Sequence, residues 1–241
     1  MDGMGDTMRG VILAGGTGSR LGLMTRSINK HLLPVYDRPM IMWPLKVLRD
    51  NGIEDITIVS SPDGVGQIAR LLGSGHEHGC RFTYRVQDQP GGIAQALECA
   101  MEKGENDIAV ILGDNVFVPS PTVIECGEAI ARVWLVKVPD LSSFGVPSFR
   151  GDMIESVIEK PTIPPSKYAI TGLYVLADLE LYHLRQLTPS SRGELEITDI
   201  LNFYAKRKRL QHSFVDGFWG DAGTIDGMAE CSEACRKAAQ K

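Results

Sequence analysis

Short apolar runs alternate with helical patterns along the first half of this chain. Strands are predicted at residues 11–14, 56–60, 82–86 and 108–112, and helices at residues 40–51, 65–72 and 93–103. Strand and helix in this order are typical of a mainly parallel central sheet with helices on both faces, so we expect a Rossmann-like α/β fold. Ligands of such sheets bind beyond the carboxyl ends of the strands, and a site is therefore expected in the segments that follow them.

The first predicted helix is punctuated by a proline and a glycine. Pro39 stands where the helix is expected to begin, and Gly52 follows its expected end. Proline prefers the first turn of a helix and glycine the position after the last turn, so the two residues support this assignment.

The second half of the chain has a different pattern. Shorter strands are predicted at residues 132–138, 145–149, 154–159 and 168–176, followed by helices at 179–187, 198–206 and 225–239. We expect this half to extend the sheet and to build a second wall. At 241 residues with 43% hydrophobic content the chain is large enough for one α/β domain, predicted at 9–241, after a flexible N-terminal extension at 1–8.

Charge and cysteine content exclude several classes of protein. A net charge of -5 argues against a nucleic-acid partner, and the single basic run, residues 206–209, closes a predicted helix, where cations suit the dipole. The five cysteines have no CxxC spacing, which indicates neither a disulfide framework nor a zinc site. No apolar run approaches the ~20 residues of a membrane span, so no membrane contact and a cytoplasmic location are expected.

The first strand runs directly into a glycine-rich loop that ends on an arginine. Gly15, Gly16 and Gly18 lack a Cβ, so the backbone can bring its N–H groups against phosphate oxygens. Arg20 and Lys30 add two cations, which suits a pyrophosphate leaving group. The alternative is a tight strand-to-helix turn without a ligand. The spacing fits neither a Walker-type loop nor a dinucleotide fingerprint.

Two aspartates follow glycines at predicted loop positions. Asp114 comes after the strand at 108–112, and Asp221 lies in a turn before a helix whose N-cap is expected at Thr224 or a near neighbour. Mg²⁺ in proteins is usually held by one or two carboxylates together with substrate phosphates. Each aspartate alone is equally compatible with an Asx-turn, but together with the glycine loop they favour a Mg²⁺ site.

A strand end presents an acid and a cation together at Glu159 and Lys160. A surface ion pair is the simpler interpretation. The functional alternative is that Lys160 binds an incoming phosphate nucleophile while Glu159 accepts hydrogen bonds from sugar hydroxyl groups.

Taken in this order, these segments resemble the sugar-nucleotide pyrophosphorylases, and within that family the glucose-1-phosphate thymidylyltransferases. The matching motifs are LAGGTGSRL at 13–21, NKHLLPV at 29–35, VQ at 86–87, GGIAQA at 91–96, LGDN at 112–115, EKP at 159–161, YAITGLY at 168–174 and RGELEITD at 192–199. The resemblance spans nearly the whole chain. It implies the nucleotide-diphospho-sugar transferase type of fold, with a sugar-binding half in the second part.

The resemblance implies a Mg²⁺-dependent condensation of dTTP with α-D-glucose 1-phosphate, which gives dTDP-glucose and pyrophosphate by in-line displacement at the α-phosphorus. No general base is required, because a sugar phosphate is already ionised at neutral pH. Thymine and uracil share the imide edge, so UTP and other hexose 1-phosphates remain alternatives. A homo-oligomer is also expected.

The same resemblance assigns residues to roles. Arg20, Lys30 and Lys160 would be catalytic, and Asp114 and Asp221 would hold Mg²⁺. The implied nucleotide-binding residues are Leu13, Gly15, Gly16, Thr17, Gly18, Ser19, Arg20, Gln87, Gly92 and Asp114. The implied sugar-binding residues are Asn115, Gly145, Glu159, Lys160, Ile170 and Thr171. Residues 9–115 would then be mainly the nucleotide-binding half and residues 116–241 mainly the sugar-binding half.

Some positions depart from the family pattern. His31 stands where many relatives carry glutamine, and Gly220 and Ala222 replace bulkier neighbours of the metal aspartate. The chain ends soon after the last predicted helix, whereas longer relatives add a region associated with feedback control. A catalytically silent subunit that senses a nucleotide sugar is a second interpretation, disfavoured because the proposed cations and aspartates are present. A nicotinamide-dependent oxidoreductase is a third, and the missing ribose-binding acid counts against it.

Overall fold

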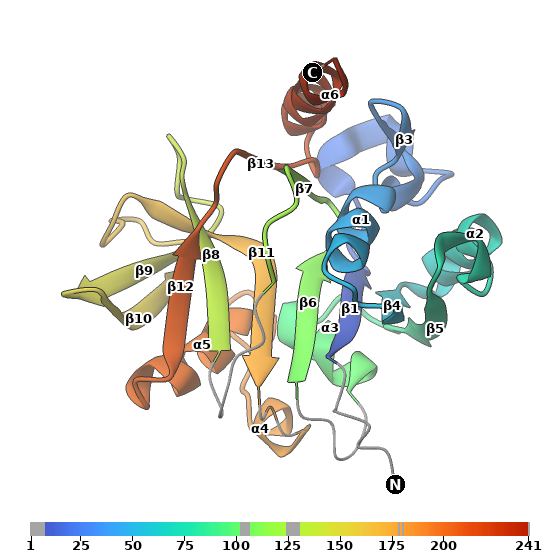
Figure 1. The fold of residues 1–241 in the computed structure, drawn as a ribbon. Helices are drawn as coiled ribbons and strands as arrows, with labels where there is room; N and C mark the ends of the chain where they lie inside the picture. Colours follow the sequence, from blue (N-terminus) through green and yellow to red (C-terminus); the bar gives the residue numbers. More distant parts are fainter. Residues whose placement is uncertain (1–7, 102–106, 124–130, 178, 180, 241) are drawn as a thin grey trace, which may run out of the picture.

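A seven-stranded sheet forms the centre of the computed structural model, which describes residues 8–101, 107–123, 131–177, 179 and 181–240 (Figure 1). The strand order is β12-β8-β11-β6-β1-β4-β5. The bounds are β1 (Arg9–Ala14), β4 (Asp55–Ser60), β5 (Arg81–Val86), β6 (Asp107–Leu112), β8 (Ala131–Lys137), β11 (Tyr168–Ala177) and β12 (Leu210–Phe214). Only β11 runs antiparallel to its neighbours within this sheet. The expectation of a mainly parallel sheet is confirmed.

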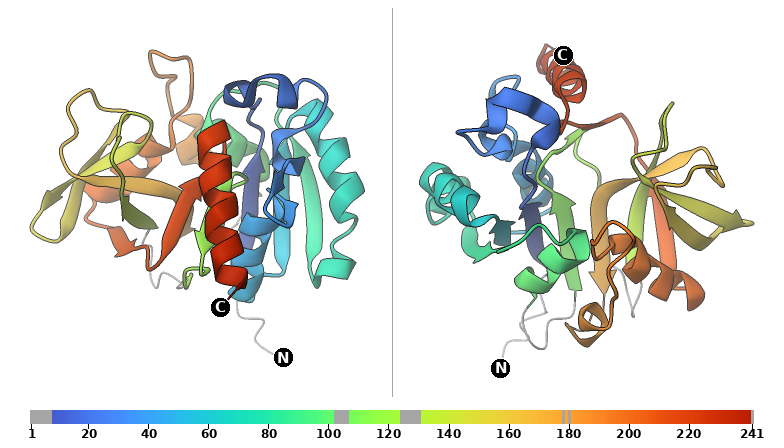
Figure 2. Two further views of the ribbon diagram at one scale, coloured as in Figure 1. Left: turned by 90° about the horizontal axis from the view of Figure 1, so that it is seen from above. Right: turned by 180° about the vertical axis from the view of Figure 1, so that it is seen from behind.

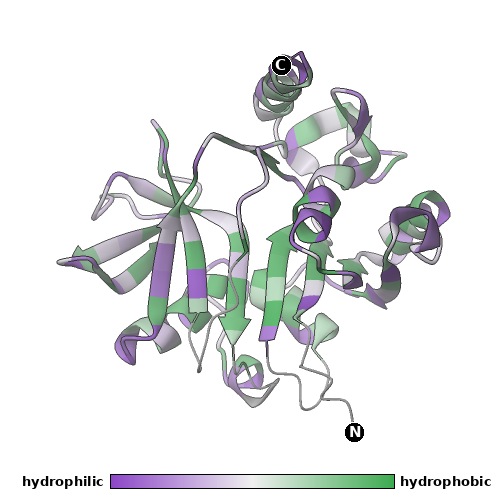
Figure 3. Ribbon diagram, in the orientation of Figure 1, coloured by the Kyte–Doolittle hydropathy of each residue, from purple (hydrophilic) through white to green (hydrophobic). Residues whose placement is uncertain are grey.

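Helices cover both faces of the sheet, as expected (Figure 2). They are α1 (Met42–Asp50), α2 (Pro62–Leu72), α3 (Ile93–Ala100), α4 (Leu181–Arg185), α5 (Ile197–Lys206) and α6 (Ile225–Ala239). Side chains alternate along a strand, so Val11 and Leu13 pack toward α3 and α5, while Ile12 and Ala14 pack toward α1 and α2. The strands at the centre, β6 among them, are accordingly apolar on both faces (Figure 3).

The prediction that Pro39 opens the first helix is wrong. Pro39 belongs to β3 (Arg38–Pro39), which pairs with β2 (Pro34–Val35), and α1 begins only at Met42. Pro44 lies in the first turn of α1, where its missing N–H group is tolerated, so a helix-start proline is present five residues later. Gly52 follows the helix with a φ of 73°, as predicted.

Two short strands that the sequence pattern did not predict hold the centre of the molecule together. They are β7 (Asn115–Val118) and β13 (Phe218–Asp221), which pair antiparallel and place Asn115 opposite Asp221. Strand β12 and the 3-10 helices η1 (Ser19–Thr25), η2 (Lys30–Leu32) and η3 (His76–His78) were also not predicted.

The second wall is a hairpin that packs on a helix. Strands β9 (Gly145–Arg150) and β10 (Met153–Glu159) pair antiparallel outside the main sheet. The side-chain amide of Asn202 in α5 donates to the carbonyl of Val157 and accepts from its N–H, both at 2.8 Å. The hairpin is therefore the expected second wall, whereas β8, β11 and β12 are the expected extension of the main sheet.

Met8, which was expected to belong to the N-terminal extension, lies within the described residues. Met8 is buried against the core beside α1, whereas the rest of the expected extension, residues 1–7, lies outside the described residues. Cys80, Cys99, Cys231 and Cys235 are free thiols, and Cys126 lies outside the described residues. Among the described helices, none combines the length and the apolar character needed to cross a membrane.

Candidate active site

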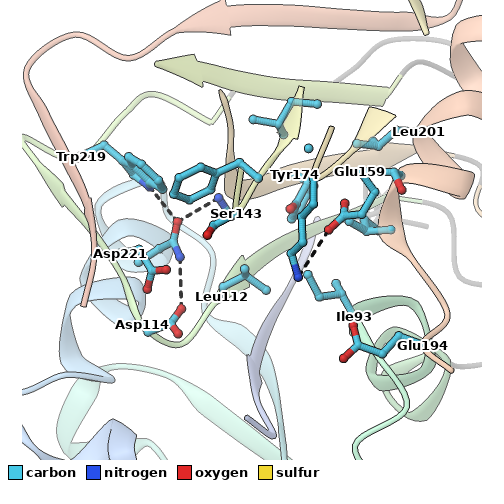
Figure 4. A pocket seen from close by; sticks show the side chains of 18 of the residues that line it. Ile93, Leu112, Asp114, Ser143, Glu159, Tyr174, Glu194, Leu201, Trp219 and Asp221 are labelled. Carbon is cyan, nitrogen blue, oxygen red and sulfur yellow. Dashed lines mark hydrogen bonds and ion pairs between the residues drawn. The ribbon is translucent and has the colours of Figure 1, made fainter. Parts of the chain in front are cut away.

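Two adjoining cavities open at the carboxyl ends of β1 and β6. The larger cavity has a volume of about 550 Å³ and the smaller one about 370 Å³. Both are lined by Arg20, Asp114, Glu159 and Lys160. Figure 4 shows the larger cavity, with Asp114 and Asp221 on one side and Glu159 and Glu194 on the other. The candidate charged residues are therefore gathered where the two cavities meet.

Most of the predicted site residues line these cavities. The smaller cavity adds Leu13, Gly15, Gly16, Thr17, Lys30, Gln87 and Gly92. The larger cavity adds Ser19, Asn115, Gly145, Ile170 and Asp221. Gly18 and Thr171 line neither cavity. Gly18 has a φ of 71° and begins η1, so its glycine serves the turn of the loop, and Thr171 is fully buried in β11.

The glycine loop is tightly packed against two polar side chains. A Cβ on Gly15 would overlap Oε1 of Gln87, and a Cβ on Gly16 would lie 3.0 Å from Nζ of Lys30. Glycine at these two positions lets the backbone approach side chains on two different segments without displacing them.

Lys30 and Asp114 form a buried ion pair at the floor of the smaller cavity. Nζ of Lys30 donates to Oδ2 of Asp114 at 2.5 Å, and the side chains are only 9% and 10% exposed. Burial alone would raise the pKa of Asp114, but the charge and hydrogen bond of Lys30 hold this pKa well below its ordinary value. Asp114 is thus a fixed anion.

Asp221 converges with Asp114 on a small space that Gly223 keeps open. A Cβ on Gly223 would lie 2.8 Å from Oδ1 of Asp221 and 3.0 Å from Oδ2 of Asp114. The same point is 2.9 Å from the Arg20 guanidinium. Burial, followed by repulsion from Asp114, raises the pKa of Asp221. The described residues hold no group of three or more histidine, cysteine or acidic side chains suited to a metal. The two converging carboxylates, Asp114 and Asp221, form a candidate metal site because of their geometry alone.

Asn115 holds three strands at the site. Its Oδ1 accepts from the N–H of Gly172 at 2.8 Å and from Nε1 of Trp219 at 2.7 Å, while its Nδ2 donates to Asp114 at 3.2 Å. This amide therefore orients Asp114. Trp219 was not predicted to line the site, and its place two residues before Asp221 was the available signal; the structure puts both residues in β13, where a turn was expected at Asp221.

Glu159 and Lys160 end β10 at the junction of the cavities. Lys160 has a φ of 44°, a left-handed conformation held by its N–H group, which donates to the carbonyl of Phe144 at 3.0 Å. Burial, and then repulsion from Glu196, raises the pKa of Glu159. Nζ of Lys160 lies 3.9 Å from this carboxylate. Both residues are thus in the cavity wall, with Lys160 the more exposed.

Gln87 is held by a second amide that the sequence did not single out. Nε2 of Gln87 donates to Oε1 of Gln95 at 2.6 Å and to the carbonyl of Gly92 at 3.3 Å. Gln95 lies in the GGIAQA motif, which was the available signal. The carbonyl oxygen of Gln87 faces Gly15, so its amide orientation is fixed within the smaller cavity.

His31, which departs from the family pattern, is buried and neutral. Burial, together with the charge of Lys30, lowers the pKa of His31 to about 3. Its Nδ1 lies 2.8 Å from Oδ1 of Asn29, which can only accept, so Nδ1 carries the proton. His31 lines the smaller cavity. Histidine at this position therefore adds no charge to the site.

Comparison with known proteins agrees with this geometry. The sequence model of the nucleotidyl transferase family matches residues 9–238. Glucose-1-phosphate thymidylyltransferase from Neisseria gonorrhoeae is 40% identical over 93% of this chain and 81% of its own. The enzyme of that name from Mycobacterium tuberculosis is 39% identical over 95% of this chain and 82% of its own.

Solved structures share the fold. A crystal structure from Bacillus anthracis, described as a glucose-1-phosphate thymidylyltransferase in complex with sucrose, matches with a TM-score of 0.86 and 42% identity, covering 95% of this chain and 96% of that one. A UDP-glucose pyrophosphorylase complexed with UDP-glucose matches with a TM-score of 0.80 and 25% identity, covering 96% and 99%.

Proposed function

Because this chain belongs to the nucleotidyl transferase family, we propose that it joins dTTP to α-D-glucose 1-phosphate, forming dTDP-glucose and pyrophosphate. The observation that carries this proposal is the convergence of Arg20, Asp114 and Asp221 at the junction of two cavities. One cavity is lined by a glycine loop suited to a triphosphate, and the other by acceptors suited to a hexose. The names of the relatives at about 40% identity support the same substrates.

The smaller cavity would take the nucleotide. Gln87 offers a fixed amide to the pyrimidine, and the backbone of Gly15 and Gly16 approaches the pentose and the phosphates. These residues all lie within 9–115, in keeping with a nucleotide-binding half. UTP is the second candidate nucleotide, because it presents the same imide edge and because one structural neighbour binds UDP-glucose.

Asp114 and Asp221 would hold a Mg²⁺ ion. The fit rests on the space that Gly223 leaves open between them and on their mutual repulsion, which a cation would relieve. Bound there together with phosphate oxygens, the ion would neutralise charge on the triphosphate. Lys30 already pairs with Asp114, and the half-exposed Arg20 lies 3.4 Å from Asp221, so each carboxylate has one cation beside it in the free protein.

The transfer needs positioned charges and no base. An oxygen of the sugar phosphate attacks the α-phosphorus, and the bond to the pyrophosphate oxygen breaks as the new bond forms. Lys160 would orient the incoming phosphate from the wall of the cavity. Arg20, half-exposed and 3.4 Å from Asp221, would meet the charge that develops on the departing pyrophosphate.

The test is a substrate matrix. Pyrophosphate release is measured for dTTP, UTP, CTP, GTP and ATP, each with several hexose 1-phosphates. We expect the highest catalytic efficiency with dTTP and glucose 1-phosphate, followed by UTP. Binding of a nucleotide sugar without pyrophosphate release in any combination would instead support a catalytically silent sensing subunit.

A further inference from the structure

Arg192 contacts three carboxylates in the wall of the smaller cavity. Its Nη2 lies 2.7 Å from Glu196, 3.2 Å from Glu159 and 3.4 Å from Glu194. The three acids come from three places: the end of β10, the loop before α5, and the N-cap of α5. Arginine suits this position because its planar fork can serve several carboxylate oxygens at once.

The loop that carries Arg192 is also bound to the segment around Gly92. The N–H of Leu195 donates to the carbonyl of Gly91 at 2.8 Å, and its carbonyl accepts from the N–H of Ala94 at 3.1 Å. A Cβ on Gly92 would come within 2.5 Å of that carbonyl, so the two segments are in direct contact. Arg192 thus stands between the nucleotide side and the carboxylate on the sugar side.

We propose that Arg192 is a positioning residue, which holds Glu159 toward the hydroxyl groups of the hexose and joins it to the loop beside Gly92. This inference rests on the proposed function for the identity of the hexose. The ion pair itself is present in the free protein. Arg192 lies 3.2 Å from the Glu159 carboxylate, closer than Lys160 at 3.9 Å.

The charges around Glu159 explain why its ion pair with Arg192 matters. Glu196 repels the carboxylate of Glu159, whereas Arg192 and Lys160 attract it, and the buried Tyr174 interacts with it from β11. Glu194 shares the guanidinium of Arg192. Burial and Glu196 already raise the pKa of Glu159, and Arg192 opposes this. Without Arg192 the carboxyl would protonate at higher pH, and one of its oxygens would donate instead of accepting.

The test compares Arg192→Gln with Arg192→Lys and with Arg150→Gln. Arg150 pairs with Glu155 at the far end of the same hairpin and serves as the matched surface control. In Arg192→Gln we expect the KM for glucose 1-phosphate to rise about tenfold, while the KM for dTTP changes less than about twofold. The effect is no larger because the Arg192–Glu159 pair is partly exposed and solvent weakens it. Arg192→Lys keeps the charge and should recover part of the loss.

The pH profile separates positioning from simple damage to the loop. The acid limb of kcat/KM for glucose 1-phosphate should move to higher pH in Arg192→Gln and stay in place in Arg150→Gln. The second ionisation of the sugar phosphate has a pKa of about 6, and it contributes equally to the acid limb in every variant. An unmoved limb, or a loss shared equally by dTTP, would overturn the proposal.

A direct titration makes the test independent of the reaction. The carboxyl carbon of Glu159 is followed by NMR in glutamate-labelled protein without substrates, and assigned with Glu159→Gln. A higher pKa in Arg192→Gln supports the hold even if the substrate matrix fails. An identical pKa of Glu159 in the wild type and in Arg192→Gln would refute the proposed role of Arg192, whether or not the enzyme turns over dTTP.

Discussion

Replacing Gly223 with alanine places a methyl group in the space where the two carboxylates converge. The added Cβ would be 2.8 Å from Asp221, 2.9 Å from Arg20 and 3.0 Å from Asp114. These separations are shorter than a normal contact between a methyl carbon and an oxygen or nitrogen, so the polar groups must move apart. Because the methyl group meets side chains and not backbone, we expect a modest loss of stability, about 1–3 kcal/mol.

The loss of activity in Gly223→Ala should be larger than the loss of stability. Disturbing one preorganised electrostatic group costs about 2.7–4 kcal/mol of transition-state stabilisation, or about 10²–10³ in kcat. The assay is pyrophosphate release over a range of Mg²⁺ concentrations, where we expect a lower kcat and a higher concentration of Mg²⁺ at half-activation. Thermal unfolding of the same samples separates the two effects.

Gly66→Ala is the matched control for Gly223→Ala. Gly66 lies within α2, where a Cβ would meet no atom within 4 Å. Alanine there should leave activity unchanged and stabilise the protein by about 0.5–1 kcal/mol, because glycine is a poor helix former. If Gly223→Ala kept full activity at limiting Mg²⁺, the metal would not lie between Asp114 and Asp221, and the argument from the open space would be wrong.

Three further changes test other parts of the site. Lys30→Met leaves Asp114 buried without its cation, so urea unfolding at pH 7 should show a loss of about 3–5 kcal/mol. Because Lys30 lowers the folded-state pKa of Asp114 below 3.8, the ion pair stabilises the fold above that value, and this stabilisation is lost as the pH falls through the folded-state pKa. The free energies of unfolding of wild type and variant should therefore converge in strong acid. Parallel curves of this free energy against pH would contradict the argument. Lys160→Ala should raise the KM for glucose 1-phosphate and leave the KM for dTTP unchanged. A change in the KM for dTTP alone would mean that Lys160 binds the nucleotide phosphates and not the sugar phosphate. Gln87→Ala should narrow the preference for dTTP over CTP by about tenfold in kcat/KM, and an unchanged ratio would locate base recognition elsewhere.

The strands of the first half of the chain were predictable because local sequence determines them. β4, β5 and β6 were each placed to within one residue and β1 to within two, since β-branched apolar runs bounded by polar or glycine residues have few other uses. β7 and β13 were not predicted. Each has four residues and pairs with a partner about a hundred positions away, so neither has a periodicity of its own. Pro39 misled for a different reason: it belongs to a local hairpin, in which it pairs with Pro34, and α1 begins only at Met42.

The candidate site was predictable as a set of residues but not as a set of contacts. The cavities bring together most of the residues that the motifs indicated. The motifs assigned Lys30 to phosphate and Asp114 to metal, and nothing in the sequence indicated that the two would bind each other at 2.5 Å. Arg192 lay within the RGELEITD motif without a role, because its three partners meet only in the folded chain.

The pairing of β7 with β13 also bears on the order in which the protein becomes complete. Asp114 and Asp221 are far apart in the sequence. Asp221 comes close to Asp114 only when β13, which follows β12, pairs with β7. Contacts between such distant segments must overcome the entropy of closing a long loop before they stabilise the fold. A growing chain therefore completes its glycine loop and the first strands of the sheet long before the second aspartate leaves the ribosome. Asp221 follows every other predicted site residue in sequence, so a growing chain acquires the carboxylate pair after all the other parts of the candidate site.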